Sequence, residues 1–348
     1  MKNIRHVIFV IVTMVIVAGA IAVTFYYKCD LGKLKLTLQT ARWVFAPLAI
    51  LVGLLWYLVK VLRWRIILGP AQNVRYRTLL SATMIGFMAN CIISRFGELI
   101  RAAVLSIKGE TRYSASIASI ALERVFDLAT VVLFLVLALH WLEPSTVCGE
   151  ASQHWMNIVH DLSSWLGILL GFAVAFLVLL RLCPQWMTGA LAWFVRLLPR
   201  RIRGKVEGFL TTFLLGLDTL RSWRQVAAIL FLSLVHWGIQ VLFFLLAGYC
   251  FPDMAMTVPG AMLVCAVVAF GVAGLPLPGY IGIYQGSVLV AAALIARGSE
   301  DAWFGYSWLA WALNIPFVVL VGFIFLWKEN LSLSQIRNQA DASKETAG

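Results

Sequence analysis

Charged residues are scarce in this chain. Only 13% of its 348 residues are Asp, Glu, Lys or Arg, whereas 61% are hydrophobic. A soluble domain of this length carries about 25% charged residues. The shortage excludes one large water-soluble domain and indicates many apolar segments in contact with lipid. We therefore predict an all-α polytopic membrane protein.

Common signatures of catalysis and cofactor binding are also lacking. The six cysteines form no CxxC pair, and no GxSxG, HExxH, P-loop or βαβ-type GxGxxG motif occurs. These absences predict no metal, no cofactor and no ATP-driven motor. The net charge of +12 would suit nucleic acid, but the basic residues lie between apolar segments and form no basic stripe. We therefore expect no nucleic-acid partner.

Six apolar stretches are long enough to cross a bilayer as helices of about 20 residues. The first lacks a small-residue cleavage site, which indicates a retained span and not a signal peptide. A short polar tail, 331–348, is expected to be disordered and cytoplasmic, so that 1–330 forms a single membrane domain. The six predicted spans are Val7–Tyr27, Trp43–Leu62, Ser114–Trp141, Leu162–Leu182, Val226–Tyr249 and Trp303–Trp327.

Two further apolar regions are interrupted and predict broken, re-entrant hairpins. Thr78–Ile107 is broken by the sequence SRFGE, and its second leg, Leu99–Ile107, is too short to cross at 1.5 Å per residue. Val258–Ala296 is broken by the sequence PLPG, and either of its legs could be long enough to span. In both regions the chain is expected to return to the side from which it entered.

The distribution of Lys and Arg predicts the orientation. Twenty of these residues fall in loops on the side of the N-terminus, with Lys60 and Arg63 counted among them, and five fall on the other side. We therefore expect both termini in the cytoplasm and the protein in the cytoplasmic (inner) membrane. The two hairpins then have opposite senses, as in transporters built from inverted repeats.

Six ionisable residues lie inside these apolar segments, where each charge costs about 2.5–3.5 kcal/mol on insertion scales. Their formal charges sum to zero, and the simplest arrangement packs the first hairpin against the following span. Glu123 and Asp127 share a helix face, roughly 15 and 21 Å along the axis from Tyr113. The six are Arg95, Glu98 and Arg101 in the hairpin, and Glu123, Arg124 and Asp127 in the span.

Two interpretations of these charges remain open. They could form a closed network that only fixes helix packing. They could instead line a water-filled cavity that accepts a polar headgroup, since arginine suits phosphate by its bidentate geometry. Ionisable residues within a membrane favour the second interpretation.

The second break carries residues that stop a helix and residues that form hydrogen bonds. The freed backbone groups need partners in protein or in cavity water. A kink without a ligand remains the alternative. The residues are Pro276, Pro278, Gly279, Gly282, Tyr280, Tyr284 and Gln285. Separately, His236 and Gln240 share a helix face, and this spacing favours a packing hydrogen bond over a proton relay.

At these motifs the chain resembles the transmembrane, flippase-type domain of the lysylphosphatidylglycerol synthase/flippase proteins, over nearly its whole length. Two departures occur: Ile93 stands where the family usually has Pro, and Gln285 stands where it often has Glu, which removes a charge. The cytosolic aminoacyl-transferring domain of the two-domain proteins is absent, so we expect no aminoacylation by this chain. The motifs are Asn90, Arg95-Phe96-Gly97-Glu98 with Arg101, Glu123-Arg124 with Asp127, and Pro276-Leu277-Pro278-Gly279 with Gly282.

The resemblance implies lipid translocation rather than enzymatic activity. We expect an anionic or glycosylated headgroup, from an anionic phospholipid, a glycolipid or a polyprenyl-linked lipid, to pass through a polar cavity between the hairpins. The alternative is a membrane-embedded transferase, or an accessory subunit that works with a lipid-modifying enzyme. The expected substrate-binding residues are Asn90, Arg95, Glu98, Arg101, Glu123, Arg124, Asp127, Pro276, Pro278, Gly279, Gly282, Tyr284 and Gln285.

Overall fold

The computed structural model describes 31–69, 74–93, 96–108, 111–142, 222–274, 277–295 and 297–331, with a few helical residues between 161 and 171. Every regular element in these ranges is helical, which confirms the all-α prediction. The predicted span Val7–Tyr27, most of the span Leu162–Leu182 and the tail from 332 onward lie outside the described residues.

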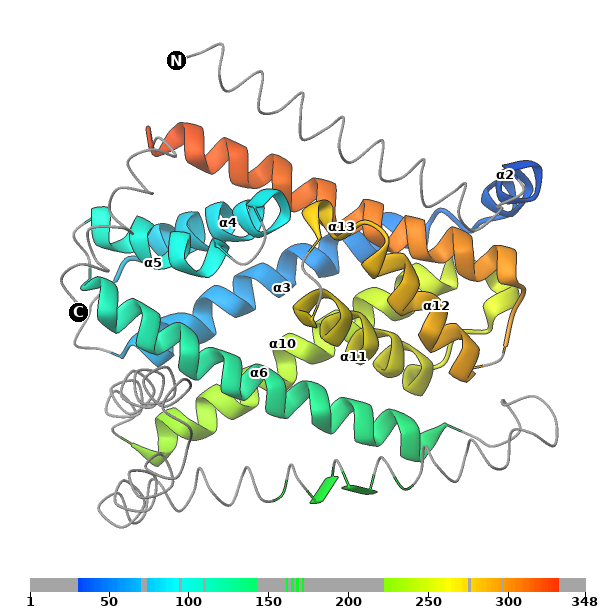
Figure 1. Ribbon diagram of the computed structural model, residues 1–348, viewed down its shortest axis with the longest axis horizontal. Helices are drawn as coiled ribbons and strands as arrows, with labels where there is room; N and C mark the ends of the chain where they lie inside the picture. The colour runs from blue at the N-terminus through cyan, green and yellow to red at the C-terminus, as the bar shows by residue number, and fades with distance from the viewer. Residues whose placement is uncertain are drawn as a thin grey trace, which may run out of the picture.

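Four long helices form the body of the protein: α3 (Phe45–Leu68), α6 (Tyr113–Trp141), α10 (Trp223–Tyr249) and α13 (Glu300–Lys328). They run along the long axis of the molecule, and a short helix, α2 (Leu31–Gln39), lies at one end (Figure 1). Among the described residues, four segments are long and apolar enough to cross a membrane: α3, α10, α13 and the stretch Pro278–Ile295.

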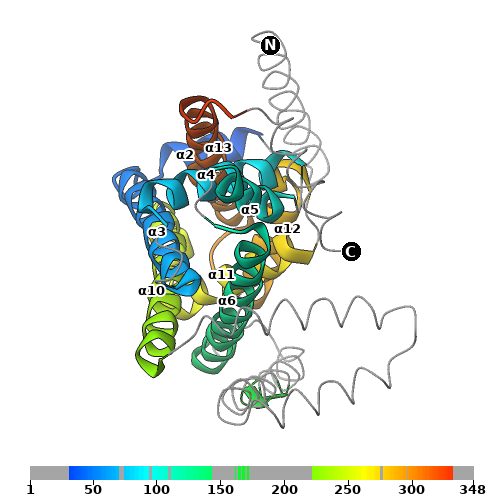
Figure 2. The same cartoon turned by 90° about the vertical axis from the view of Figure 1, so that its left-hand side faces the viewer.

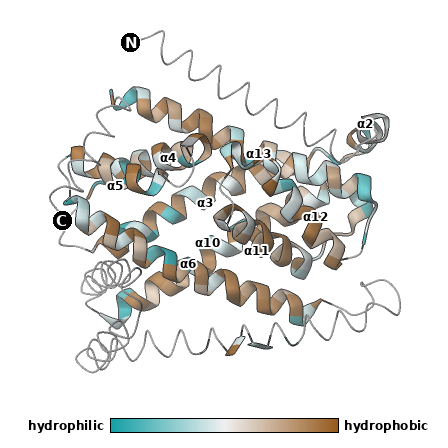
Figure 3. Ribbon diagram, viewed as in Figure 1, coloured by the Kyte–Doolittle hydropathy of each residue, from teal (hydrophilic) through white to brown (hydrophobic). Residues whose placement is uncertain are grey.

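The outer faces of the long helices are apolar. Leu51 of α3, Phe231 of α10 and Leu320 of α13 are each more than half exposed. Hydrophobic residues cover most of the length of these helices (Figure 3). Exposed apolar surface on this scale would be unfavourable in water, so it marks the faces that meet lipid.

The boundary predicted for the second span is wrong. The helix does not end at Leu62 but continues to Leu68, so Lys60 and Arg63 lie within it. Both were assigned to a cytoplasmic loop, yet both side chains are buried. The apolar residues that follow them keep the helix within the bundle, and the two cations turn toward its interior.

Both interrupted regions fold as hairpins. The first consists of α4 (Tyr76–Ile93) and α5 (Gly97–Ile107). The second consists of α11 (Val258–Gly274), the short 3₁₀ helix η4 (Pro278–Tyr280) and α12 (Ile283–Ile295).

The hairpins enter the bundle from opposite ends, as predicted. Figure 1 shows α4 and α5 in the left half of the molecule and α11 and α12 in the right half. In the end view, α4 and α5 lie between α13 and α6 (Figure 2). The turn of the second hairpin, η4, contacts α4, so the hairpins meet near the middle of the bundle.

The legs of the first hairpin pack closely because two glycines face each other. A Cβ atom on Gly86 would lie 2.7 Å from the carbonyl oxygen of Gly97, closer than real Cβ atoms approach. Asn90 completes this contact, since its Oδ1 accepts a hydrogen bond from the Gly97 N–H at 2.8 Å. This bond satisfies one free donor at the start of α5. The structure therefore gives Asn90 a role in holding the hairpin together.

The open end of this hairpin is tied to the end of α13 by an ion pair between Lys108 and Glu329. Partial burial alone would raise the pKa of Glu329, but the hydrogen bond and the positive charge of Lys108, together with the neighbouring Ser81, outweigh it and set the pKa below its usual value. A lowered carboxyl pKa contributes stability at neutral pH that is lost as the pH falls through the folded-state value.

We expect Glu329→Gln to lower the free energy of unfolding at pH 7 by about 0.2–1 kcal/mol, as for other partly exposed pairs. The difference from wild type should shrink as the pH falls through the lowered carboxyl pKa and then vanish, because the wild-type carboxylate becomes protonated. Thermal unfolding in detergent across this pH range measures the effect. A difference that is constant with pH would contradict an ionic origin.

Candidate functional site: a buried charge cluster beside an aromatic cavity

Three helices bring seven ionisable side chains together. The predicted contact between the first hairpin and the next span is present, because α5 packs on α6. Helix α3 adds two cations that were not predicted to take part. Five of the seven side chains are at most 7% exposed, all except Glu98 and Arg124. We call this set the charge cluster: Lys60 and Arg63 on α3, Glu98 and Arg101 on α5, and Glu123, Arg124 and Asp127 on α6.

Arg63 is the best-connected member of the cluster. Its Nη2 donates to Asp127 Oδ1 at 2.5 Å and to Glu123 Oε1 at 3.3 Å. Its Nη1 donates to Ser233 Oγ on α10 at 2.9 Å. The planar guanidinium group therefore joins α3, α6 and α10 through a single side chain.

Lys60 lies one helical turn before Arg63 and faces the same carboxylates. Its Nζ pairs with Glu123 and lies 3.6 Å from Asp127 Oδ2. Asp127 also accepts a hydrogen bond from Trp237 Nε1 at 3.0 Å. The carboxylates on α6 are thus largely occupied by α3 and α10.

Arg101 is buried with few partners. Its Nη2 lies 3.1 Å from Glu123 Oε2, but none of its three nitrogens forms a well-directed hydrogen bond with any described residue. Its guanidinium carbon lies 3.7 Å from the centre of the Trp64 ring. The Trp64 indole is fixed by a bond from its Nε1 to Ser119 Oγ at 2.9 Å. Arg101 therefore lies over a ring, with Nη2 near Glu123 and with Nε and Nη1 lacking hydrogen-bond partners among the described residues.

Arg124 and Glu98 form the accessible edge of the cluster. Their side chains are 44% and 40% exposed, and Arg124 Nε lies 3.0 Å from Glu98 Oε1. Arg124 Nη1 also lies 3.5 Å from Asp127 Oδ2. This ion pair therefore lies between the protein surface and the buried members of the cluster.

The charges of the cluster do not sum to zero, which corrects the sequence-based expectation. In the described part of the chain, three buried cations face two buried carboxylates. The exposed pair, Arg124 with Glu98, adds no net charge. The sum differs because Lys60 and Arg63 join the cluster; Arg95 lies outside the described residues and is not counted. Among the described residues, the buried part of the cluster therefore carries one positive charge in excess.

The turn of the second hairpin is held by backbone geometry and by Gln285. Gly279 and Gly282 have positive φ angles of 63° and 85°, which glycine adopts without strain. The Gly279 carbonyl accepts a bond from Trp311 Nε1 at 2.8 Å. Gln285 Oε1 accepts the Gly282 N–H at 2.9 Å, which caps the start of α12. Gln285 is thus a structural cap in this structure.

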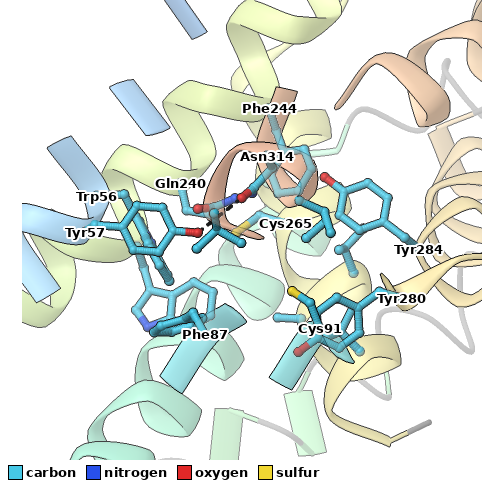
Figure 4. Close-up of a pocket in the computed structure, with 16 residues that line it drawn as sticks. Trp56, Tyr57, Phe87, Cys91, Gln240, Phe244, Cys265, Tyr280, Tyr284 and Asn314 are labelled. Carbon is cyan, nitrogen blue, oxygen red and sulfur yellow. Dashed lines mark hydrogen bonds between the residues drawn. The ribbon is translucent and has the colours of Figure 1, made fainter. Parts of the chain in front are cut away.

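A cavity of about 150 Å³ lies beside this turn (Figure 4). Its walls come from α3, α4, α10, α11, α12, α13 and η4, and aromatic rings form much of them. None of its lining residues is charged. Its neutral polar groups belong to Tyr57, Gln240, Tyr280, Tyr284 and Asn314. We call it the aromatic cavity.

The charge cluster and the aromatic cavity share a wall. Trp56, Phe87 and Trp237 all line the cavity. Lys60 Nζ lies 5.5 Å from the ring centres of Trp56 and Phe87, and Trp237 donates to Asp127. A group bound in the cavity would therefore be one ring away from the cations.

His236 on α10 packs against this wall. Its imidazole stacks on Trp56 with ring centres 4.4 Å apart. Neither ring nitrogen has a hydrogen-bond partner among the described residues, so the predicted packing hydrogen bond is absent there.

The structure places most of the predicted site residues in two groups. Glu98, Arg101, Glu123, Arg124 and Asp127 meet in the charge cluster. Pro278, Gly279, Gly282, Tyr284 and Gln285 lie at the second hairpin, where Tyr284 lines the cavity. Asn90 joins the legs of the first hairpin, and Arg95 and Pro276 lie outside the described residues.

Sequence reasoning missed Lys60, Arg63, Ser233 and Trp237. A signal for the first two was present, because the sequence WRIIL after Arg63 is mostly apolar and Lys60 and Arg63 share a helix face. The predicted span, Trp43–Leu62, ended before Arg63, and Lys60 near its end was counted with the following loop. Ser233 and Trp237 carried no comparable signal, since their contacts depend on how α10 packs.

Within the described ranges, no group of three or more His, Cys, Asp or Glu side chains is arranged to hold a metal ion. The family model described as the lysylphosphatidylglycerol synthase TM region matches residues 10–322. Neither the curated proteins nor the solved structures contain a significant match. The family match connects this multi-pass membrane protein with membrane lipids.

Proposed function

The chain belongs to the lysylphosphatidylglycerol synthase TM-region family, and from this premise we propose that it translocates lipids with anionic headgroups across the cytoplasmic membrane. The charge cluster receives the headgroup phosphate. Both termini face the cytoplasm in this proposal, so the first hairpin opens to the cytoplasm and the second to the other side. The transport step makes and breaks no covalent bond.

The excess positive charge in the cluster is the observation that carries this proposal. Three buried cations face two carboxylates, and the donors of Arg101 lack well-directed partners among the described residues. A buried charge is unfavourable unless it is paired and hydrogen-bonded. A phosphate oxygen would supply the missing acceptor and the missing negative charge.

The exposed pair provides a route to this site. Arg124 meets the phosphate first and exchanges its contact with Glu98 for one with the lipid. Arg101, on the inner side, then accepts the phosphate. The acyl chains remain in the bilayer, against the apolar outer faces of the helices.

Translocation in reconstituted vesicles tests this proposal. Acyl-labelled phosphatidylglycerol is placed in both leaflets, and a quencher that cannot cross the membrane reports which label reaches the outer leaflet. We expect Arg101→Ala to slow translocation by about 10- to 100-fold, the range for losing one charge-assisted interaction. Glu98→Gln should lower the lipid concentration that gives half-maximal rate, because Arg124 loses its competing carboxylate.

The matched control is Lys108→Ala, which removes a cation at the end of α5 but outside the cluster. Its rate should equal that of wild type. Equal rates for wild type, Arg101→Ala and Glu98→Gln would reject the assignment of the site. No co-substrate is added, so movement of the label reports transport and not lipid synthesis.

A further inference from the structure

We propose that the aromatic cavity binds an uncharged, hydroxylated six-membered ring, of the hexose or inositol type, that is carried on the phosphate bound by the charge cluster. This inference rests on the proposed function and narrows its substrate class. The preferred lipid is then a phospholipid whose phosphate bears a sugar or cyclic polyol.

The volume of the cavity admits the six-membered core of such a ring, and its lining suits the ring faces and hydroxyls. An apolar cavity of about 150 Å³ is large enough for a benzene molecule. The aromatic cavity has a volume of about 150 Å³ and offers ring faces together with the amides of Gln240 and Asn314. The Tyr57 hydroxyl donates to Asn314 Oδ1 at 3.4 Å, a long bond that a ligand hydroxyl could replace.

A second observation points to a ligand with polar groups. Tyr284 is 2% exposed and faces the cavity, yet its hydroxyl has no hydrogen-bond partner among the described residues. A buried hydroxyl without a partner costs free energy. A ligand hydroxyl in the cavity would satisfy it.

The neighbouring charges exclude a cationic occupant. Aromatic rings alone would also suit a quaternary ammonium group. Here, however, Trp56 and Phe87 also contact a cation, because Lys60 Nζ lies 5.5 Å from the centre of each ring. The cluster carries an excess of positive charge, so a second cation one ring away would be repelled.

The membrane surroundings argue against an acyl chain. Lipid tails are as apolar as the lining of the cavity, so a tail gains little by leaving the bilayer for it. A hydroxylated ring does gain, because it cannot satisfy its hydrogen bonds in hydrocarbon. The shared wall formed by Trp56, Phe87 and Trp237 places this ring beside the charge cluster.

The test compares three acyl-labelled lipids in vesicles that contain the full chain: phosphatidylinositol, phosphatidylglycerol and phosphatidylcholine. We expect phosphatidylinositol to move about tenfold faster than phosphatidylglycerol, the factor for one or two net hydrogen bonds. Phosphatidylcholine should move slowest. Gln240→Met and Asn314→Leu replace amides by apolar groups of similar size and should reduce the inositol-to-glycerol rate ratio toward one.

The control is Gln225→Met, the same change on α10 at a residue outside the cavity, which should keep the wild-type ratio. A wild-type ratio of one, with phosphatidylglycerol still moved in an Arg101-dependent manner, overturns this inference and leaves the proposed function intact. Movement of phosphatidylcholine at the rate of phosphatidylinositol also overturns it.

A binding measurement separates the lipid from a soluble ligand with the same chemistry. Inositol 1-phosphate and glycerol 1-phosphate are titrated into the full chain in a detergent without a sugar headgroup, because a maltoside would compete. Tighter binding of inositol 1-phosphate that is lost in Gln240→Met supports the cavity site. A chain that binds inositol 1-phosphate but moves no phosphatidylinositol overturns the lipid as its source.

Discussion

Replacing Arg101 by methionine should strongly slow the transport of anionic lipids without destabilising the protein. We expect the free energy of unfolding to stay unchanged or to rise by up to about 2 kcal/mol, in the range seen when buried ionic groups are replaced by apolar ones. Translocation of phosphatidylglycerol should fall by at least about tenfold.

This combination follows from the position of Arg101 in the cluster. Its side chain is 2% exposed, and its nitrogens lack well-directed hydrogen bonds to described residues. Its removal leaves Glu123 paired with both Lys60 and Arg63. The contact with Trp64 is lost, at a cost of about 0.5–2 kcal/mol, but the unpaired donors disappear as well. Methionine fills most of the volume beside the ring.

Thermal unfolding in detergent and vesicle translocation, measured on the same preparation, check this prediction. Lys108→Met is the matched control and should change neither property by much, since its ion pair is partly exposed. A loss of about 3 kcal/mol or more in Arg101→Met would mean that Arg101 belongs to a closed structural network. The excess charge would then have no bearing on lipid binding.

Much of the fold could be predicted because few backbone structures are stable in a bilayer. Backbone groups in hydrocarbon must be bonded internally, so apolar runs of about 20 residues become helices. The interruption between Ile93 and Gly97 was recognisable because charged residues and glycine broke such a run. The shortness of the second leg, Leu99–Ile107, then predicted a hairpin.

The site was harder to predict because its partners come from distant parts of the sequence. Glu98, Arg101, Glu123 and Arg124 were found, since each lies inside an apolar segment. Lys60 was assigned to a loop because a cation near the end of a span normally extends to the interface. Here it turns inward to Glu123, a contact that depends on the packing of α3 against α6.

The aromatic cavity had no sequence signature at all. Its lining comes from seven elements, and single aromatic residues on membrane helices are common. Tyr284 was singled out only because it follows the Pro-Gly break. Which rings face one another depends on where η4 meets α4, and this is decided by tertiary packing.

Replacing Arg63 by methionine should have the opposite outcome to Arg101→Met. We expect the free energy of unfolding to fall by about 3–5 kcal/mol, the range for breaking a buried ion pair. The reason is the number of groups that depend on Arg63. Asp127, Glu123 and Ser233 all accept its hydrogen bonds, at 2.5, 3.3 and 2.9 Å.

The double variant Arg63→Met, Asp127→Leu tests whether the loss of stability in Arg63→Met comes from breaking its ion pair with Asp127. It removes one positive and one negative charge, so the excess in the cluster is unchanged. We expect it to be more stable than the sum of the two single losses predicts, by about 0.5–3 kcal/mol. Additive losses would mean that the side chains act independently.

Comparison of the two arginines distinguishes a residue that stabilises the fold from a residue that binds lipid within one cluster. Both are buried, and both contact Glu123. Arg63 joins three helices and has well-directed partners, whereas Arg101 rests on Trp64 with its donors available. If Arg63→Met proved as stable as Arg101→Met, this division of roles would be wrong. A fall in stability confined to Arg63→Met, with transport lost in Arg101→Met, would establish it.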